Sequence, residues 1–379
     1  MSESQKSDSA DQRRIVVIGG GVLGVSIAVH LLRSGADVTL VTEGELASGA
    51  SGRSLSWLNS AGTRSREYHA LRMAGIDRYR TLFAEDPSRE WLQFGGGVYW
   101  DKGDDGTSTM GRHEYELSHA YDSHLVGPES IADFTTGLNA DALAETSIYN
   151  PGEGWVSLPH LIAHLVAEFM RRGGVLEANA GRAEVVVEDG RAVGVMAPAV
   201  GTLGADAVVV ACGAHTPDVV APLGVQIDNG SPVSMLVVTE PLDHTVKAVL
   251  NTPHAAIRPN PGGTIAIDHD WYEEHIVRDA LGEYSIPEPV VDELLKKAGR
   301  LIDGTPELKA GSWKLGLKPI PGDGEPVFGE LAKVPGCFVA FTHSGATLAL
   351  IAGELLADEV LTGSRHPMLA TFRPERFEA

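Results

Sequence analysis

Three glycines near the start of the chain have the spacing that a bound dinucleotide requires. Gly19, Gly21 and Gly24 read GxGxxG and directly follow a buried strand predicted at residues 15–18. The first glycine allows a tight turn, the second lets the backbone approach a pyrophosphate, and the third lets the next helix lie close to the strand. Glu43 follows a second predicted strand, where a carboxylate can bind ribose hydroxyls. This order predicts a dinucleotide site.

A membrane-spanning helix is the alternative for the apolar residues 15–32. The glycines and the acid at Glu43 argue against it. Apolar residues at helical spacing from Val25 to Leu32, with a stop at Ser34 and Gly35, predict an ordinary helix after the glycine turn.

Length and charge limit the classes of function. A chain of 379 residues predicts two domains, and 43% hydrophobic with 21% charged residues is typical of a globular protein. A net charge of −21 disfavours nucleic acid and anionic membranes as partners. The polar segment 1–13 predicts a disordered leader without an export signal, and hence a cytoplasmic location. Cys212 and Cys337, the two cysteines, predict buried strand residues and no metal site.

The apolar patterns predict a discontinuous α/β fold. Strand-like runs recur at residues 185–187, 207–211 and 337–341, and helical patterns cover 159–172 and 347–361. Alternating segments punctuated by proline and glycine between 223 and 318 predict antiparallel strands. We therefore expect a Rossmann-like cofactor domain and an antiparallel-sheet substrate domain. The expected bounds are 14–90, 150–222 and 319–379 for the first domain, and 91–149 and 223–318 for the second.

Four blocks of sequence stand out together: the glycine motif, ASGASGRS at 47–54, VVVACGA at 208–214, and GLKPIPGDGEPVFG at 316–329 followed by FTHSGATLAL at 341–350. In this order they resemble the FAD-dependent amine and amino-acid oxidoreductases typified by D-amino-acid oxidase, glycine oxidase and monomeric sarcosine oxidase. The resemblance covers nearly the whole chain, and within this family the chain is most similar to glycine oxidase-like enzymes.

The resemblance implies a bound FAD and the residues that hold it. The serine-rich tract and its arginine suit a pyrophosphate and ribityl chain, and the last block suits a helix N-terminus against the flavin. The cofactor residues expected from this reasoning are Gly19, Gly21, Val22, Leu23, Gly24, Glu43, Ser48, Ala50, Ser51, Gly52, Arg53, Ser54, Val185, Ala211, Cys212, Gly213, Gly316, His343, Ser344, Gly345, Ala346 and Thr347. Sarcosine oxidases tether their flavin through a cysteine at the position that matches Gly316, so we expect noncovalent FAD.

The implied reaction is oxidation of the carbon–nitrogen bond of an amino acid or N-substituted glycine by hydride transfer to the flavin, followed by hydrolysis of the imine. Oxygen is the expected electron acceptor. Two alternatives stay open: a dehydrogenase that passes electrons to a quinone or protein, and a non-catalytic FAD-binding protein.

Substrate recognition departs from the relatives. Lys318 stands where D-amino-acid and glycine oxidases carry an arginine that grips the substrate carboxylate, and lysine lacks that bidentate fork. Sarcosine oxidases have lysines where this chain has Thr347 and Ile265. His269 matches an active-site histidine of those enzymes, with a surface strand-end histidine as the alternative.

Other cations are candidates for an anionic substrate. Arg258 begins the alternating strand region, and Arg64 and Arg66 follow the serine-rich tract. Each is individually more typical of a surface or structural arginine, but together they favour an anionic amine or amino acid.

Overall fold

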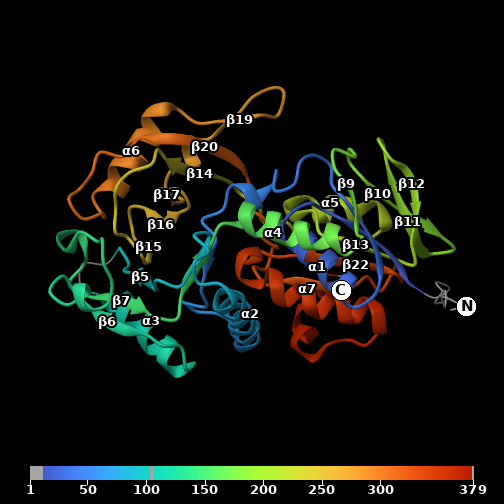
Figure 1. Cartoon of the computed structure of the whole chain (residues 1–379), viewed down its shortest axis with the longest axis horizontal. Coiled ribbons are helices and arrows are strands. Elements are labelled where there is room, and N and C mark those ends of the chain that lie inside the picture. Colours follow the sequence, from blue (N-terminus) through green and yellow to red (C-terminus); the bar gives the residue numbers. More distant parts are fainter. Residues whose placement is uncertain (1–11, 103–105, 378–379) are drawn as a thin grey trace, which may run out of the picture.

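A parallel sheet forms the centre of one half of the molecule (Figure 1). This computed structural model describes residues 12–102 and 106–377. The six strands, in sheet order, are β21 (Val327–Glu330), β22 (Cys337–Phe341), β13 (Ala207–Val210), β1 (Arg14–Ile18), β2 (Asp37–Val41) and β9 (Val175–Glu177). All neighbouring pairs are parallel except β21 with β22.

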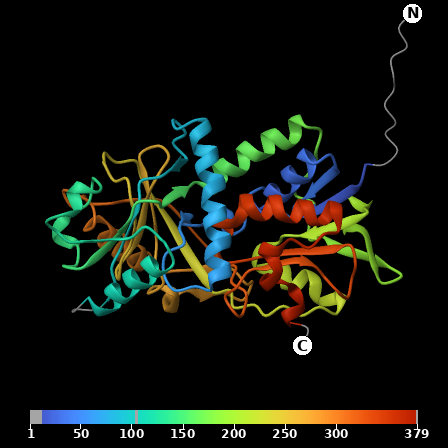
Figure 2. The same ribbon diagram turned by 90° about the horizontal axis from the view of Figure 1, so that it is seen from below.

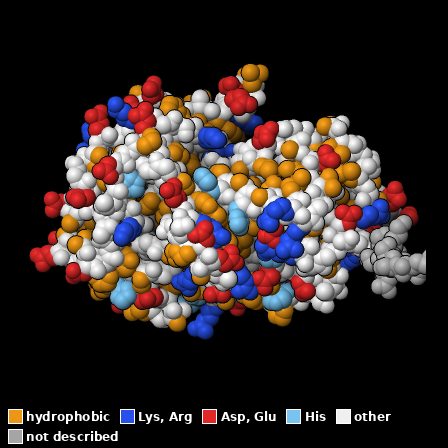
Figure 3. Space-filling view, in the orientation of Figure 1, with side chains coloured by type: hydrophobic (Ala, Val, Ile, Leu, Met, Phe, Trp, Pro, Cys, Tyr) orange, Lys and Arg blue, Asp and Glu red, His pale blue; other side chains and the backbone are white. Residues whose placement is uncertain are grey.

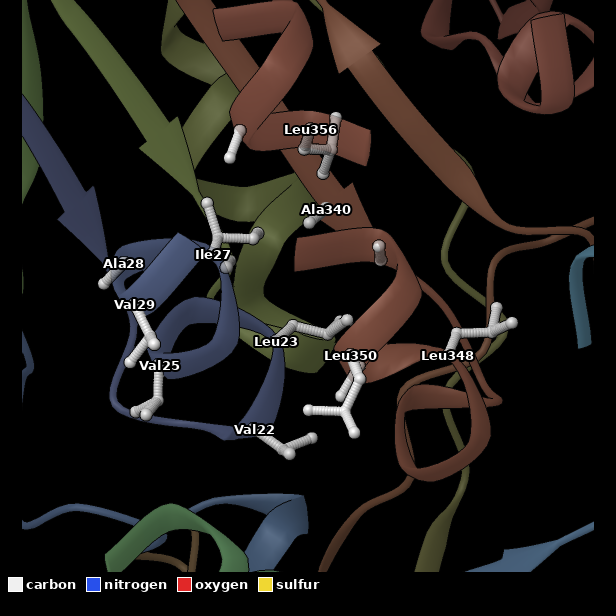
Figure 4. Packing of buried hydrophobic residues seen from close by; sticks show 14 of the residues in the cluster. Val22, Leu23, Val25, Ile27, Ala28, Val29, Ala340, Leu348, Leu350 and Leu356 are labelled. Atoms are coloured by element: carbon white, nitrogen blue, oxygen red, sulfur yellow. The ribbon is translucent and has the colours of Figure 1, made fainter. Parts of the chain in front are cut away.

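Alternation along β1 explains how this sheet is covered. Ile15 and Val17 belong to the core on one face, whereas Val16 and Ile18 belong to the core on the other. The first face packs against α1 (Val22–Arg33), α4 (Leu158–Arg171) and α7 (Gly345–Thr362). Figure 4 shows side chains of α1 facing those of α7 in this core. Because both faces are buried, the strands are almost continuously apolar.

The second face meets a small antiparallel sheet of β10 (Glu184–Glu188), β11 (Arg191–Ala197) and β12 (Gly201–Gly204), together with α5 (Thr216–Val220). The expected strand at 185–187 is confirmed, but it lies in this covering sheet and not in the parallel one.

An eight-stranded sheet dominates the other half of the molecule (Figure 1). Its order is β20 (Ala310–Leu317), β14 (Val233–Thr239), β17 (Thr264–Asp268), β16 (Ala256–Asn260), β15 (Val249–Asn251), β5 (Gly97–Tyr99), β7 (Ser147–Asn150) and β6 (His124–Val126). The pairing is antiparallel, as predicted, apart from the parallel pair of β15 and β5. The helices α3 (Thr107–Ser118) and α6 (Glu288–Gly299) belong to this half. The expected domain bounds stay a prediction.

The helix α2 (Arg66–Glu85) runs between the two halves (Figure 2). Near it, β3 (Trp57–Leu58), β8 (Gly154–Val156) and β4 (Leu92–Gln93) form a three-stranded sheet, and β18 (Val277–Arg278) pairs with β19 (Tyr284–Ser285) in a separate hairpin. The Ser65 side chain caps the first turn of α2 by accepting a hydrogen bond from the Tyr68 amide.

The first and last helices lie close to where the sequence predicted them. The first helix ends at Arg33, close to the predicted stop, and no described helix is long and apolar enough to cross a membrane. The last helix begins at Gly345, two residues before the predicted start. Most of the expected leader, residues 1–11, lies outside the described residues. Gln12 and Arg13 are described, and their side chains donate to the carbonyls of Gly35 and Val360.

Candidate functional site

A cavity of about 780 Å³ lies where the carboxyl ends of β1, β2 and β13 approach the ends of β17 and β20. Figure 3 shows a hollow near the middle of one face, with Lys or Arg and His side chains gathered around it. Segments from both halves of the molecule line this cavity. The end of a parallel sheet is the usual place for a ligand in this architecture.

The glycine turn forms one wall. Gly19 has a φ of +125°, and a Cβ atom there would overlap the carbonyl oxygen of Ala211. A Cβ atom on Gly24 would overlap the carbonyl oxygen of Gly19, so this glycine allows the helix to lie against the strand, as predicted. Gly21 faces the cavity directly. The backbone at this turn therefore has room for a ligand that no side chain occupies.

The serine-rich tract closes over the start of α1. Ser51 Oγ accepts a hydrogen bond of 3.0 Å from the Val22 amide, and residues 50–52 form a short 3₁₀ turn. Arg53 Nη1 donates to the Ser48 carbonyl at 2.9 Å, while its Nε is buried and has no partner among the described residues. A Cβ atom on Gly316 would overlap the Arg53 guanidinium. The tract thus presents a half-buried cation beside the glycine turn.

The opposite side of this wall comes from the ends of β2 and β13. Glu43, just after β2, lines the cavity, as do Ala211, Cys212 and Gly213 after β13. Cys212 therefore follows its strand and is not part of it, which corrects the prediction. Burial raises the pKa of its thiol to about 12, with the Glu43 carboxylate as a further cause. The thiol accordingly stays protonated near neutral pH.

The turn before α7 forms the third wall. Tyr68 Oη donates to Ser344 Oγ at 2.5 Å, and the Arg72 guanidinium donates to the same oxygen. Burial lowers the pKa of His343 to about 4, and the nearby cations Lys318, Arg72 and Arg64 act in the same direction. The imidazole is therefore neutral at physiological pH. Thr347 Oγ1 donates to the Trp57 carbonyl at 3.2 Å, so it joins this turn to β3.

Lys318 directly follows β20 and lines the cavity from the side of the eight-stranded sheet. Its Nζ is 3.7 Å from a Glu273 carboxylate oxygen. Asp268, at the end of β17, also lines the cavity, and burial raises its pKa while Lys318 opposes that rise. The lysine ammonium therefore faces two acidic side chains of the protein itself.

His269 lies beside Asp268 and lines the cavity, as the sequence suggested for an active-site residue. Its Nε2 is 3.1 Å from the Thr252 carbonyl oxygen, and its Nδ1 accepts from the Trp271 amide at 3.2 Å and lies 2.7 Å from Asp270. Both ring nitrogens are thus engaged by the protein.

The residues present fit a dinucleotide that carries a flavin. The turn admits a close backbone approach, Glu43 supplies a carboxylate, and Arg53 supplies a half-buried cation without an acidic partner among the described residues. The sequence matches the family described as "DAO: FAD dependent oxidoreductase" over residues 14–359. The chain belongs to this family. FAD is its cofactor, and the protein is an FAD-dependent oxidoreductase.

Several related proteins are named as enzymes that act on amines or amino acids. Mitochondrial dimethylglycine dehydrogenase of Rattus norvegicus is 28% identical over 175 residues, which are 44% of this chain and 19% of that protein. The match thus spans about a fifth of the dimethylglycine dehydrogenase. Glycine oxidase of Pseudomonas aeruginosa is 25% identical over 375 residues, which are 94% of this chain and 96% of that protein.

A solved structure is similar over nearly the whole length. Glycine oxidase from Geobacillus kaustophilus superposes with a TM-score of 0.80 at 22% identity, covering 96% of this chain and 99% of that one. This likeness shows that the FAD-dependent oxidoreductase has the fold that the sequence predicted.

Most of the predicted cofactor residues line the cavity of this oxidoreductase, but four do not. Gly24 lies beneath the turn, and Gly52 and Gly316 lie behind the side chains and backbone that do face the cavity. Val185 lies in the covering sheet, because β10 pairs with β11. It is not among the residues that line the cavity, and its assignment to the cofactor stays a prediction.

Two of the predicted substrate-binding arginines also lie outside the cavity lining. Arg258 is fully buried, and its N–H groups donate to the carbonyls of Leu55 and Pro259 and to the side chain of Asn260. Arg66 is exposed in the first turn of α2. Neither is placed to bind a ligand there, because one guanidinium is committed to the protein and the other faces solvent.

Several residues that line the cavity were not predicted from the sequence. Asp268 stood at the end of a predicted strand, next to His269, and that position could have signalled it. Trp57, Asn59 and Arg72 carried no such signal, because they reach the cavity through contacts between segments distant in sequence: Arg72 donates to the Asn59 carbonyl at 2.7 Å and also to Ser344.

Proposed function

We propose that this protein oxidises the carbon–nitrogen bond of an amino acid or an N-substituted glycine. The observation that carries the proposal is a single cavity lined both by the dinucleotide turn and by the cation Arg64. Such a cavity can hold the cofactor and an anionic amine together. When bound, FAD accepts a hydride from the carbon next to nitrogen, and the resulting imine hydrolyses in water.

The residues of the chain bind and orient in this reaction. Gly345, Ala346 and Thr347 begin α7 at the cavity, and the positive end of a helix dipole stabilises negative charge that develops there. The neutral His343 adds no positive charge near physiological pH, because burial keeps the pKa of its imidazole low.

The experiment is anaerobic bleaching of the purified yellow protein with a panel of glycine, sarcosine, longer N-alkylglycines and D-amino acids. Loss of the oxidised flavin spectrum with one or more of these amines is the expected result. A bound flavin that none of them reduces would contradict the proposal and favour a non-catalytic FAD-binding protein.

Oxygen is the proposed electron acceptor. The matched rat protein is named a dehydrogenase, which favours an organic or protein acceptor as the second candidate. Peroxide formed during turnover in air supports the oxidase, whereas dye reduction without peroxide supports the dehydrogenase.

We also propose that FAD is held without a covalent bond. Position 316 offers no thiol, and the thiol of Cys212 stays protonated and bonds to the Ile18 carbonyl at 3.6 Å. Acid precipitation should release all the yellow colour into the supernatant. Flavin that stays with the precipitated chain would contradict this.

A further inference from the structure

The cations that line the cavity differ in whether the protein already gives them hydrogen-bond partners or nearby carboxylates. Arg72 donates to Asn59 and Ser344 through all three of its guanidinium nitrogens. Arg182 lies 3.8 Å from an Asp218 carboxylate oxygen. Lys318 faces Glu273 and Asp268. Each of these charges therefore has a partner in the folded chain.

Two lining arginines, Arg53 and Arg64, have a buried Nε without a partner among the described residues. Arg53 lies in the serine-rich tract beside the glycine turn, where the cofactor's own phosphates supply negative charge. Arg64 lies elsewhere, two residues before α2 and near the turn that carries His343. An anion other than the cofactor phosphates is needed to pair with it.

The surroundings hold Arg64 in place without neutralising it. The hydroxyl of Tyr115 bonds to both the amide and the carbonyl of Arg64, and the guanidinium carbon lies 5.5 Å from the centre of the Tyr68 ring. Burial lowers the pKa of Arg64 to about 10, with Arg72 as a further cause. A half-buried guanidinium that is still charged at neutral pH and has a buried nitrogen without a partner among the described residues gains from an added anion.

The nearby acid at Glu325 does not fill this role. Its two carboxylate oxygens each accept from Ser65 Oγ at 3.2 Å, and it forms no ion pair with Arg64 among the residues described. Ser65 is also the cap of α2. The carboxylate is thus bound to the start of the helix, outside the cavity lining.

We propose that Arg64, and not Lys318, binds the carboxylate of the substrate. The proposal rests on the proposed function for the identity of the anion as an amino acid or N-substituted glycine. It replaces the anchor expected from the GLKP block. A carboxylate can accept two N–H bonds from a guanidinium in one plane, which suits Arg64 better than an ammonium already shared between two acids.

The test is a binding titration of the FAD-loaded protein, followed by the change in flavin absorption. The probes are benzoate and its uncharged analogue benzamide. Wild-type protein should bind benzoate well and benzamide poorly. Arg64→Met should raise the Kd for benzoate by at least about 30-fold, as expected when one partner of a buried charge pair is truncated. Lys318→Met should change it by less than about threefold, because its charge is already balanced.

Matched variants separate binding from folding. Arg66→Met removes an exposed arginine two residues away and should leave the Kd unchanged, while Arg64→Lys should retain part of the affinity. FAD content and the thermal unfolding temperature of every variant show whether the fold persists. Should Arg64→Met lose FAD, Arg64→Gln replaces it as the test.

Three results would overturn the proposal: equal affinity of wild-type protein for benzoate and benzamide, unchanged benzoate binding in the folded Arg64 variant, or a large loss in Lys318→Met. Because the titration needs no turnover, it succeeds or fails independently of the amine panel. Carboxylate binding through Arg64 with no amine oxidised would sink the proposed function alone.

Discussion

The two sides of the cavity are built by different means. On the cofactor side, backbone atoms and glycines such as Gly19 and Gly24 do most of the work, and they lie within a few residues of one another. On the substrate side, charged side chains from β17, β20 and the loop before α2 meet across long stretches of sequence. Binding on the cofactor side therefore depends on the room left by glycines, whereas binding on the substrate side depends on which charged side chains already have partners in the protein.

The largest effect should come from filling that space. In Gly24→Ala the new methyl group would overlap the backbone at Gly19, so α1 must move away from β1. We expect a loss of about 2–4 kcal/mol in the free energy of unfolding and loss of bound FAD. Thermal unfolding and the flavin-to-protein absorbance ratio measure both.

Gly49→Ala is the matched control, since a Cβ atom at Gly49 meets nothing within 4 Å and its φ of −81° is ordinary. Equal behaviour of the two variants would show that the close approach at Gly24 is not needed.

A pH-dependent effect should come from a buried acid that bonds to Trp57, a residue of the cavity lining. Glu153 is fully buried, accepts from Trp57 Nε1 at 2.6 Å and bonds to Tyr121 Oη at 2.6 Å. Burial raises its pKa from 4.5 to about 8. Protonation therefore favours the folded state: this contribution is complete below about pH 4.5 and is lost as the pH rises through about 8.

Glu153→Gln keeps both hydrogen bonds and removes the titration. Between about pH 5 and 8, wild-type stability should fall relative to the variant by up to about 1.4 kcal/mol per pH unit. Denaturant unfolding of both proteins across this range measures the difference. Parallel curves would show that Glu153 is ionised throughout.

A smaller effect is expected at the edge of the cofactor side. Glu43→Ala should weaken FAD binding by about tenfold, as expected for the loss of hydrogen bonds from ribose hydroxyls to a charged group. The rate of flavin reduction at saturating FAD should not change. Fluorescence titration of the apoprotein with FAD gives the affinity, and an unchanged Kd would remove Glu43 from the cofactor site.

The smallest effect should come from His269. Both ring nitrogens already contact the protein, so His269→Gln should change the flavin reduction rate by less than about threefold. Stopped-flow reduction with the best amine of the panel checks this. A hundredfold fall in the flavin reduction rate would instead indicate that His269 contacts the substrate.

Sequence reasoning worked where function depends on short spacing. The glycine turn, the acid at Glu43 and the helix that begins near Thr347 all follow from local patterns, and the structure brings them to one cavity. The sequence did not show which arginines have partners inside the protein, because burial and packing decide this. Arg258 and Arg64 look alike in the sequence, yet one donates its N–H groups to the backbone while the other keeps a buried nitrogen without a described partner. Only the packing of distant segments distinguishes them.

The contact between Gly316 and Arg53 makes two distant positions mutually dependent. The Arg53 guanidinium occupies the space where a side chain at 316 would lie. A flavin tether placed there by Gly316→Cys would displace the Arg53 guanidinium, whereas Arg53→Ser would remove that contact. In the double variant the thiol has room, whereas in the single variant it displaces a half-buried charge. The energies of these two substitutions should therefore not add, so the cost of a thiol at position 316 depends on which residue stands at position 53.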